Sequence, residues 1–310
     1  MYQLGLLPSL RMAWSSAVAR ALVVVAGLSC AACGAARGDT AATHSPTATA
    51  RASTPAARAS TPAAASSASA ALELRSTLDT ALASVRREDD YHVSVAVDDL
   101  TTGLRAADGG TTRYVTASIV KVDILATLLY QAQLSGQALT AGEQELATTM
   151  IENSNNDSAS DLYDDAGGAV AIDRANRVLG LMETTVGTDG YWGLTTTTVD
   201  DQIRLLRDVF TSSSPLTASS RQYIQSLMSQ VEADQQWGVP AAASSGTAFM
   251  VKNGWLPNPT LWEINSIGEV SRDGQHLLIA VLSDDNATED GGITVVQSAA
   301  LAAARAASRA

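Results

Sequence analysis

Cysteine and histidine are scarce in this 310-residue chain, and their scarcity argues against several kinds of chemistry. Both cysteines, Cys30 and Cys33, lie in the N-terminal segment, so the rest of the chain has no thiol for a disulfide, a metal or a nucleophilic attack. After residue 71 the histidines are His92 and His276, each inside a strand pattern beside apolar residues. A zinc site or a Ser-His-Asp triad needs more than these two side chains. We therefore predict no metal in this protein.

The composition also disfavours nucleotides and nucleic acids. No glycine loop precedes a lysine in the phosphate-binding pattern and no G-x-G-x-x-G occurs, so we predict no cofactor. From Leu72 onward the chain contains 15 basic and 31 acidic residues, a net charge of −16. This charge repels nucleic acid and anionic lipid alike. An anionic small-molecule substrate would need a local positive group.

Lysine is the scarcest charged residue. Of the 20 basic residues only Lys121 and Lys252 are lysines, and all the others are arginines. Arginine keeps its proton in proteins, whereas burial or a nearby cation can lower the pKa of a lysine until it accepts a proton from a hydroxyl. The two lysines are therefore the first candidates for acid–base chemistry.

The N-terminal segment has the pattern of an export signal. Residues 1–38 contain a charged start, the apolar run "ALVVVAGLS" and small residues, which is typical of a signal peptide rather than a spanning helix. Either Cys30 or Cys33 could accept a lipid, although the bacterial lipobox has a leucine-like residue where this chain has Gly27 or Cys30. We predict an exported protein, extracellular or associated with the cell envelope. A lipid-anchored and a freely secreted form both stay open.

A low-complexity stretch separates this signal from the folded part. Residues 39–71 consist almost entirely of Ala, Ser, Thr and Pro and repeat "RASTPAA". Such a composition buries too little apolar surface to offset its ordering entropy, which predicts a disordered linker. Residues 72–310 then form one domain, which we expect to be a monomer.

Hydrophobic periodicity in this domain predicts an α+β fold. A helical stripe that includes Leu74, Leu78 and Leu82 is followed by a half-buried strand and a turn to a hairpin partner. A block of helices with capping signals comes next, among them a capping box from Thr140 to Glu143. Three strands and a last helix close the chain. The predicted fold is an antiparallel sheet built from both chain ends and flanked by helices, with a helical subdomain. The expected strands lie at 92–99, 248–254, 261–270 and 276–283, and the outer helices at 73–88 and 294–307.

The stretch "TASIVKVDILATLL" places Ser118 three residues before Lys121 at the start of an apolar helix. Residues three apart are neighbours on a helix surface, and a serine in the first turn lies where the helix dipole stabilises negative charge. This pair could be a nucleophile and its base. Alternatively, Ser118 could simply cap the helix.

Two further stretches favour the catalytic interpretation. "MIENSNNDS" places Ser154, Asn155 and Asn156 in a polar loop before a helix, and "FMVKNGW" places Lys252 at the end of a strand. With S-I-V-K at residue 118, these motifs resemble the S-x-x-K, S-D-N and K-T-G motifs of the penicillin-recognising serine hydrolases, in particular the class A β-lactamases. Their order and their helix, loop and strand contexts also match.

The resemblance implies a role for each matching residue. Ser118 would be the acyl-accepting nucleophile, Lys121 its base and Ser154 the relay of a proton to the leaving nitrogen. Lys252 would attract the substrate carboxylate and disfavour protonation of Lys121. The substrate-binding residues implied by the resemblance are Asn156, Asn253, Gly254 and Trp255, with the backbone N–H groups of Ser118 and Trp255 as oxyanion hole.

The chain departs from the family pattern in the loop between the second and third motifs. Class A enzymes have a Glu-x-x-Leu-Asn pattern there, whose glutamate activates the deacylating water. "LMETTVGTDGYWGLTTTT" lacks it and offers only Glu183 and Asp189, which we interpret as solvated loop charges. Asn155 and Asn253 also replace the aspartate of S-D-N and the threonine of K-T-G.

Three functions remain open on the sequence. The first is an exported serine hydrolase of the class A β-lactamase type, which opens a β-lactam or a related amide through a Ser118 acyl-enzyme. The second keeps the site but acts on cell-wall peptides, as a D-alanyl carboxypeptidase or a slow penicillin-binding protein, because the deacylating glutamate is missing. The third is a non-catalytic wall-binding domain.

Overall fold

The computed structural model describes residues 62–86 and 92–309, all of which belong to the compact unit Arg58–Ala310. The predicted signal segment, both cysteines and most of the predicted linker lie outside the described residues. Among the described helices, none combines the length and the apolar character needed to cross a membrane.

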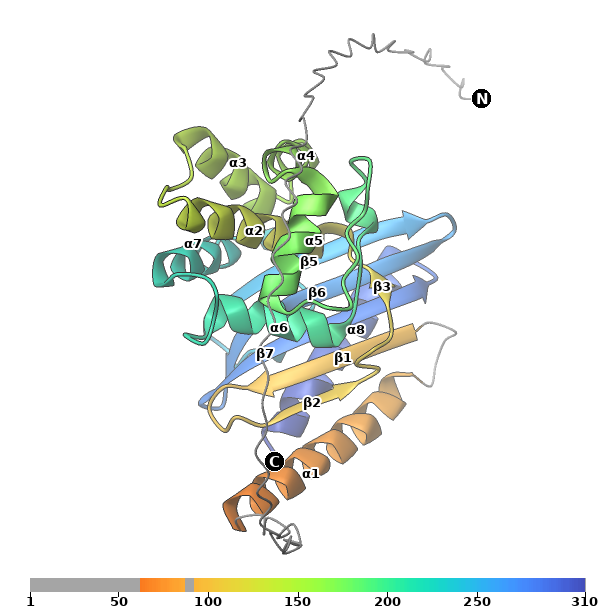
Figure 1. Ribbon diagram of the computed structural model, residues 1–310. Helices are drawn as coiled ribbons and strands as arrows, with labels where there is room; N and C mark the ends of the chain where they lie inside the picture. Colours follow the sequence, from red (N-terminus) through yellow and green to blue (C-terminus); the bar gives the residue numbers. More distant parts are fainter. Residues whose placement is uncertain (1–61, 87–91, 310) are drawn as a thin grey trace, which may run out of the picture. The chain divides into compact units, whose positions relative to one another are not determined.

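A five-stranded antiparallel sheet forms the centre of the domain (Figure 1). Its spatial order is β2-β1-β7-β6-β5, so the first strand of the chain pairs with the last. This confirms the predicted α+β fold with a sheet built from both chain ends. The strands are β1 (His92–Asp99), β2 (Arg105–Asp108), β5 (Phe249–Asn258), β6 (Leu261–Arg272) and β7 (Gln275–Asn286).

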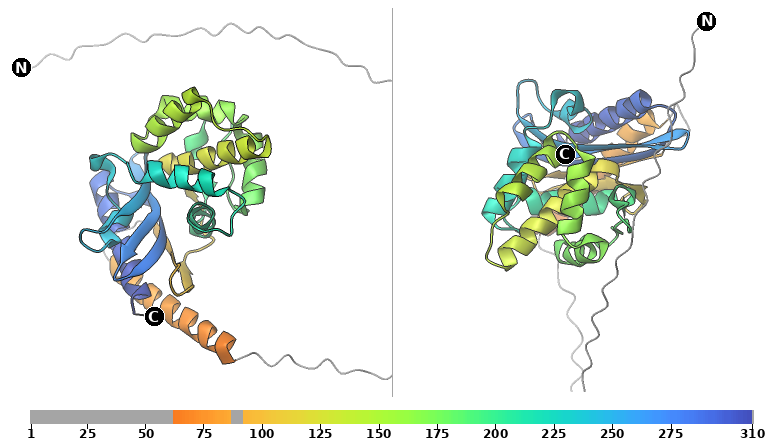
Figure 2. Two further views of the ribbon diagram at one scale, coloured as in Figure 1. Left: turned by 90° about the vertical axis from the view of Figure 1, so that its left-hand side faces the viewer. Right: turned by 90° about the horizontal axis from the view of Figure 1, so that it is seen from above.

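Two terminal helices cover one face of this sheet (Figure 2). Helix α1 (Pro62–Val85) packs on α8 (Glu289–Ala307), and the predicted stripe of Leu74, Leu78 and Leu82 is fully buried between them and the sheet. The helix begins at Pro62, so the last part of the predicted linker is helical. Proline is favoured in the first turn of a helix, and the alanine-rich run after it has high helix propensity.

The other face carries the helices from the middle of the chain (Figure 2). Their core is separate from that of the terminal helices because alternate strand residues point to opposite faces, with Ile267 and Leu282 on this side. These helices are α2 (Val120–Leu134), α3 (Ala141–Glu152), α4 (Asn156–Asp165), α5 (Gly168–Leu179), α6 (Val199–Phe210) and α7 (Ala218–Met228).

Local capping signals account for several helix boundaries. Thr140 and Glu143 form the predicted capping box of α3, and Thr198 caps α6 by accepting from the Asp201 backbone N–H. Gly180 ends α5 in the left-handed region. The sequence did not predict α7, whose Thr217 cap lies in a serine-rich stretch that resembles a loop.

Short elements connect the sheet to the motif residues. Strand β3 (Tyr114–Val115) pairs with β4 (Thr196–Thr197). After β3 the chain forms the 3-10 turn η1 (Ala117–Ile119), which leads directly into α2. A second 3-10 turn, η2 (Trp192–Leu194), packs against η1. The loop that replaces the family's Glu-x-x-Leu-Asn pattern is thereby placed beside Ser118.

Candidate active site

Ser118 lies in the middle of η1, one turn before Lys121 in α2. The N-cap positions of η1 and α2 are Thr116 and Ile119, and neither side chain makes a capping hydrogen bond. Ser118 is therefore not a helix cap. The preceding Ala117 has a φ of 46°, a left-handed conformation that is unfavourable for a residue with a side chain. The tight turn thus holds the serine ahead of the helix.

Lys121 is fully buried and its ammonium is bound by the second motif. Its Nζ donates to the Ser154 carbonyl oxygen at 2.6 Å, to Ser154 Oγ at 3.1 Å and to Asn156 Oδ1 at 2.8 Å. All three acceptors are neutral, and no described carboxylate makes a hydrogen bond to this nitrogen. The ammonium form of this lysine therefore has neutral acceptors but no hydrogen-bonded carboxylate to offset its loss of hydration.

The second lysine reaches the same serine from the sheet. Lys252 in β5 is also fully buried, and its Nζ donates to Ser154 Oγ at 3.1 Å and to the Asn253 carbonyl oxygen at 3.2 Å. Ser154 thus lies between the two amines, with a φ of 54° that fixes it at the end of α3. The structure brings together Lys121, Ser154, Asn156 and Lys252 from three separate parts of the chain.

Burial lowers the pKa of both lysines. Desolvation, with a smaller effect of the nearby Lys252 charge, lowers the pKa of Lys121 to about 6. Desolvation lowers the pKa of Lys252 to about 7, although the negative charge of Glu232 opposes this shift. Near neutral pH the Lys121 amine can accept a proton, while Lys252 is close to its own titration midpoint.

Gly254 allows β5 to approach the turn that carries Ser118. A Cβ atom on Gly254 would lie 2.6 Å from the Thr116 carbonyl oxygen and 2.8 Å from the Ser118 backbone nitrogen. Both neighbours are backbone atoms in a constrained turn and cannot move aside easily. Glycine is thus required for contact with the serine's own backbone, whereas the sequence suggested only contact with substrate.

Asn265 in the neighbouring strand β6 forms hydrogen bonds to the backbone just before the same turn. Its Nδ2 donates to the Val115 carbonyl oxygen at 2.8 Å and to the Thr116 carbonyl oxygen at 3.1 Å, and the side chain is fully buried. Asn265 was not predicted as a site residue. A polar residue in the centre of an apolar strand was the available signal, because a buried amide needs partners.

The two asparagines that depart from the family motifs have local structural roles. Asn155 is the N-cap of α4 and accepts from the Ser158 backbone N–H at 2.8 Å, which an aspartate could equally do. The buried Asn253 donates to the Gln235 carbonyl oxygen at 2.7 Å and to the Trp237 carbonyl oxygen at 3.0 Å. The structure therefore does not bring the Asn253 amide to the lysines.

Aromatic rings lie on both faces of the sheet near the third motif, with Trp255 and Trp237 packed against the core of the terminal helices. Trp255, which follows Gly254 in β5, makes an edge-to-face contact with Trp237 at a centroid distance of 6.0 Å. On the other side, the ring centroid of Trp192 lies 5.0 Å from Lys121 Nζ. The sequence analysis did not single out Trp192 or Trp237, although the scarcity of aromatic residues was a usable signal.

Neither acid of the replacement loop makes a contact with the lysines. Glu183 pairs with Arg113 at 2.6 Å, and both side chains are about half exposed. Asp189 is exposed and accepts from the Thr188 hydroxyl. The carboxylate that acts electrostatically on Lys252 is instead Glu232, which accepts from Gln235.

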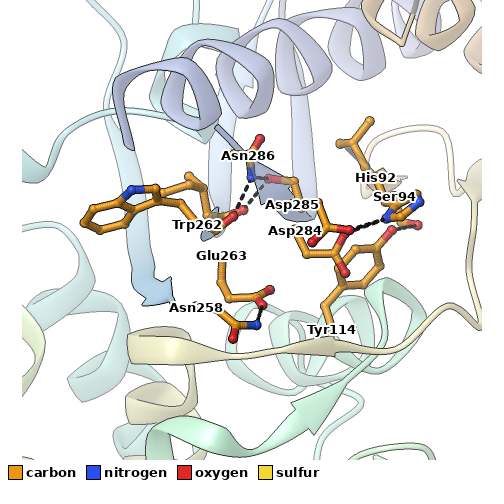
Figure 3. A network of polar contacts seen from close by, with 12 residues as sticks. His92, Ser94, Tyr114, Asn258, Trp262, Glu263, Asp284, Asp285 and Asn286 are labelled. Atoms are coloured by element: carbon orange, nitrogen blue, oxygen red, sulfur yellow. Dashed lines mark hydrogen bonds and ion pairs between the residues drawn. The ribbon is translucent and has the colours of Figure 1, made fainter. Parts of the chain in front are cut away.

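A separate polar network lies at one end of the sheet (Figure 3). Possible metal-ligating atoms of His92, Asp284 and Asp285 lie within 4.8 Å of one another there. His92 Nδ1 is 2.9 Å from Asp284 Oδ1 and 3.3 Å from Asp285 Oδ2, and the side chains are partly exposed. We interpret this group as an ion-pair network that joins the start of β1 to the end of β7.

This fold, with a serine at a helix start and two buried lysines around a second serine, defines a serine β-lactamase-like hydrolase. Solved structures with the same fold include PBP-A, class A β-lactamase from Bacteroides cellulosilyticus and TLA-1 extended-spectrum β-lactamase. Their TM-scores are 0.66, 0.67 and 0.67, and their sequence identities are 18, 14 and 16%. Each alignment covers 76 or 77% of this chain and 97 to 99% of the other.

The chain belongs to the β-lactamase enzyme family, whose model matches residues 135–307, more than half of the sequence. The match includes the second and third motifs and begins after Lys121. A relative of known sequence is "Putative lipoprotein LppW" of Mycobacterium tuberculosis and Mycobacterium bovis. It is 26% identical over 211 residues, which cover 65% of this chain and 67% of the relative.

Proposed function

We propose that this protein is an exported serine hydrolase that opens a β-lactam or a related amide through an acyl-enzyme on Ser118. The observation that carries the proposal is the pair of buried lysines that share Ser154, with Ser118 one helical turn from Lys121. Burial makes Lys121 a base near neutral pH, which a serine hydroxyl needs before it can attack.

The proposed acylation moves one proton along this network. Neutral Lys121 accepts the proton of Ser118 Oγ as the oxygen bonds to the amide carbon. The C–N bond then breaks, and the Ser154 hydroxyl gives its proton to the leaving nitrogen and is reprotonated by Lys121. At the end Lys121 is neutral again, Ser118 carries the acyl group, and the leaving nitrogen has gained one hydrogen as a neutral amine.

Lys252 and the backbone would bind the substrate in this proposal. Protonated Lys252 attracts a substrate carboxylate, and its buried position strengthens that attraction. Asn156 would contact the substrate amide while it keeps its bond to Lys121. The backbone N–H groups of Ser118 and Trp255, in segments brought together at Gly254, would stabilise the oxyanion.

Intact-mass spectrometry with benzylpenicillin tests the proposal. We expect an adduct equal to the whole antibiotic, because ring opening loses no atoms, and no adduct on Ser118→Ala. Lys121→Met should slow adduct formation strongly while leaving Ser118 in place. If wild type and Ser118→Ala behave alike, the acyl-enzyme proposal is wrong.

A second candidate, a D-alanyl carboxypeptidase or slow penicillin-binding protein, is favoured by the neutral surroundings of Lys121. No described carboxylate makes a hydrogen bond to Lys121 or Ser154, so no acid is in place to activate a deacylating water. PBP-A, a structural neighbour, has been solved as a point mutant in an acyl-enzyme complex with penicillin G. A stable adduct without turnover supports this candidate, and rapid turnover of penicillin refutes it.

The non-catalytic wall-binding alternative makes a different prediction. Binding to cell-wall fragments that Ser118→Ala and Lys121→Ala leave unchanged, with no adduct from any β-lactam or peptide, would support it. The two buried lysines argue against it, because burial of an amine costs stability and a binding domain would gain nothing from that cost.

We further propose that residues 1–38 direct export and that Cys30 or Cys33 carries a lipid. The described domain would then be connected to the envelope by the low-complexity segment. The relative LppW is named as a lipoprotein. Membrane fractionation of the full chain tests the anchor. Wild type should be found in the membrane fraction, and Cys30→Ser or Cys33→Ser should move the protein to the soluble fraction. Wild type in the soluble fraction would mean free secretion.

A further inference from the structure

Two segments of the chain enclose the Lys121 ammonium. The first is the motif at Ser154 and Asn156, which supplies its three hydrogen-bond acceptors. The second is the loop around η2, from which Trp192 places its ring over the same nitrogen at 5.0 Å. The Trp192 side chain is itself 9% exposed, so the ring covers the lysine rather than extending into solvent.

The surrounding loop holds Trp192 in place independently of Lys121. Trp192 Nε1 donates to Ser160 Oγ at 3.1 Å, and the Trp192 carbonyl oxygen accepts from Thr195 Oγ1 at 2.7 Å. The Thr195 carbonyl oxygen in turn accepts from the backbone N–H of Thr116 at 2.8 Å, two residues before Ser118. Hydrogen bonds through Thr195 thus connect the Trp192 segment to the turn that carries Ser118.

We propose that Trp192 is a positioning residue that excludes water from Lys121 and thereby prolongs the life of the acyl-enzyme on Ser118. This inference rests on the proposed function. Hydrolysis of the ester requires a water oxygen to bond to the acyl carbon while a base takes one proton, and that proton then goes to the departing Ser118 Oγ. Lys121 is neutral after acylation and could be this base, but the ring lies against its nitrogen.

The same ring contributes to the burial of the lysine. Desolvation is the largest cause of the lowered pKa of Lys121, so a hydrated site in Trp192→Ala should move that pKa upward. Loss of the cation–π attraction would lower the pKa, because a ring face favours the charged amine, but desolvation is the larger effect on Lys121 and sets the upward direction of the expected shift. Loss of the ring therefore has two separate readouts, the lifetime of the adduct and the pH dependence of its formation.

Adduct lifetime after a benzylpenicillin pulse, measured by intact mass at pH 8, tests the proposal. Trp192→Ala should lose the adduct about tenfold faster or more, and its acylation profile should shift to higher pH. Trp192→Phe, which keeps a ring, should restore the wild-type lifetime. The control is Tyr191→Ala, because the neighbouring Tyr191 ring is 66% exposed.

The outcomes separate this inference from the proposed function. If wild type forms no Ser118 adduct, the proposed function itself fails. If wild type forms the adduct but Trp192→Ala loses it at the wild-type rate with an unshifted pH profile, Trp192 does not exclude water and the inference is wrong. Trp192→Leu opens a smaller cavity and gives the same test if the alanine variant does not fold.

Discussion

The rate of Ser118 acylation should depend on pH with an optimum close to neutrality. With a pKa of about 6, about nine-tenths of Lys121 is neutral at pH 7. An ordinary lysine pKa of 10.5 would leave roughly 3 in 10,000 molecules neutral, so burial increases the fraction of active base about 3,000-fold. Lowering the pH from 7 to 5 should therefore slow acylation about tenfold.

Lys252 determines the alkaline side of this profile. Its pKa is lowered to about 7, so the positive charge that attracts a substrate carboxylate is lost as the pH rises beyond that value. The two lysines share Ser154, so the two apparent pKa values belong to the pair. A carboxylate-free ester of the substrate should keep the acidic limb and lose the alkaline one.

Stopped-flow or quenched-flow measurement of the acylation rate constant from pH 4.5 to 10 checks this expectation. An acylation rate that continues to rise up to pH 10 with the carboxylate-free substrate would show that Lys121 titrates as an exposed lysine. The argument from desolvation would then be wrong, whatever the activity of the enzyme.

Three further predictions concern stability and local geometry. The folded-state pKa values of Lys121 and Lys252 both lie below their unfolded values, so wild type should gain free energy of unfolding from about pH 7 to pH 10 in urea titrations, and Lys252→Met should lose the part of that gain that Lys252 contributes. Gly254→Ala should slow acylation about 100-fold or more, because its Cβ would displace the Ser118 backbone N–H; an unchanged rate would contradict this. Asn265→Ala should lower the free energy of unfolding by about 1–3 kcal/mol, because the carbonyl oxygens of Val115 and Thr116 each lose one hydrogen bond, whereas the exposed Asn258 should tolerate alanine.

The order and type of most elements could be predicted because local signals and the global fold agree. Thr140, Thr198 and Gly180 are capping residues whose side chains or conformations act within one turn, so the sequence alone contains their effect. Helix α7 was missed because its start consists of serine and threonine, which favour caps and loops equally. The sheet built from both chain ends was inferred from the order of the elements, but the pairing of β1 with β7 was not predicted, because periodicity within a strand does not identify its partner.

The candidate site was predictable where chemistry requires a particular residue type. Lysine scarcity identified Lys121 and Lys252 before any contact between them was known. Trp192 and Asn265 could not be found in the same way, because each acts by lying beside a residue far away in the sequence. Asn253 shows the converse limit: its motif position suggested substrate binding, whereas its amide holds the carbonyl oxygens of Gln235 and Trp237.

The sheet order β2-β1-β7-β6-β5 also has a consequence for the order of folding. The site is complete only when Lys252 in β5 reaches Ser154 and when β5 and β6 close against η1, and those strands in turn need β7 between them and β1. Most of the domain must therefore be present before the two lysines meet at Ser154, and contacts this distant in sequence form slowly. A chain that ends before β5 would lack Lys252 and the strand that contacts the Ser118 turn. Reactivity of the serine would thus arise as one of the last events of folding, after the C-terminal strands have joined the sheet.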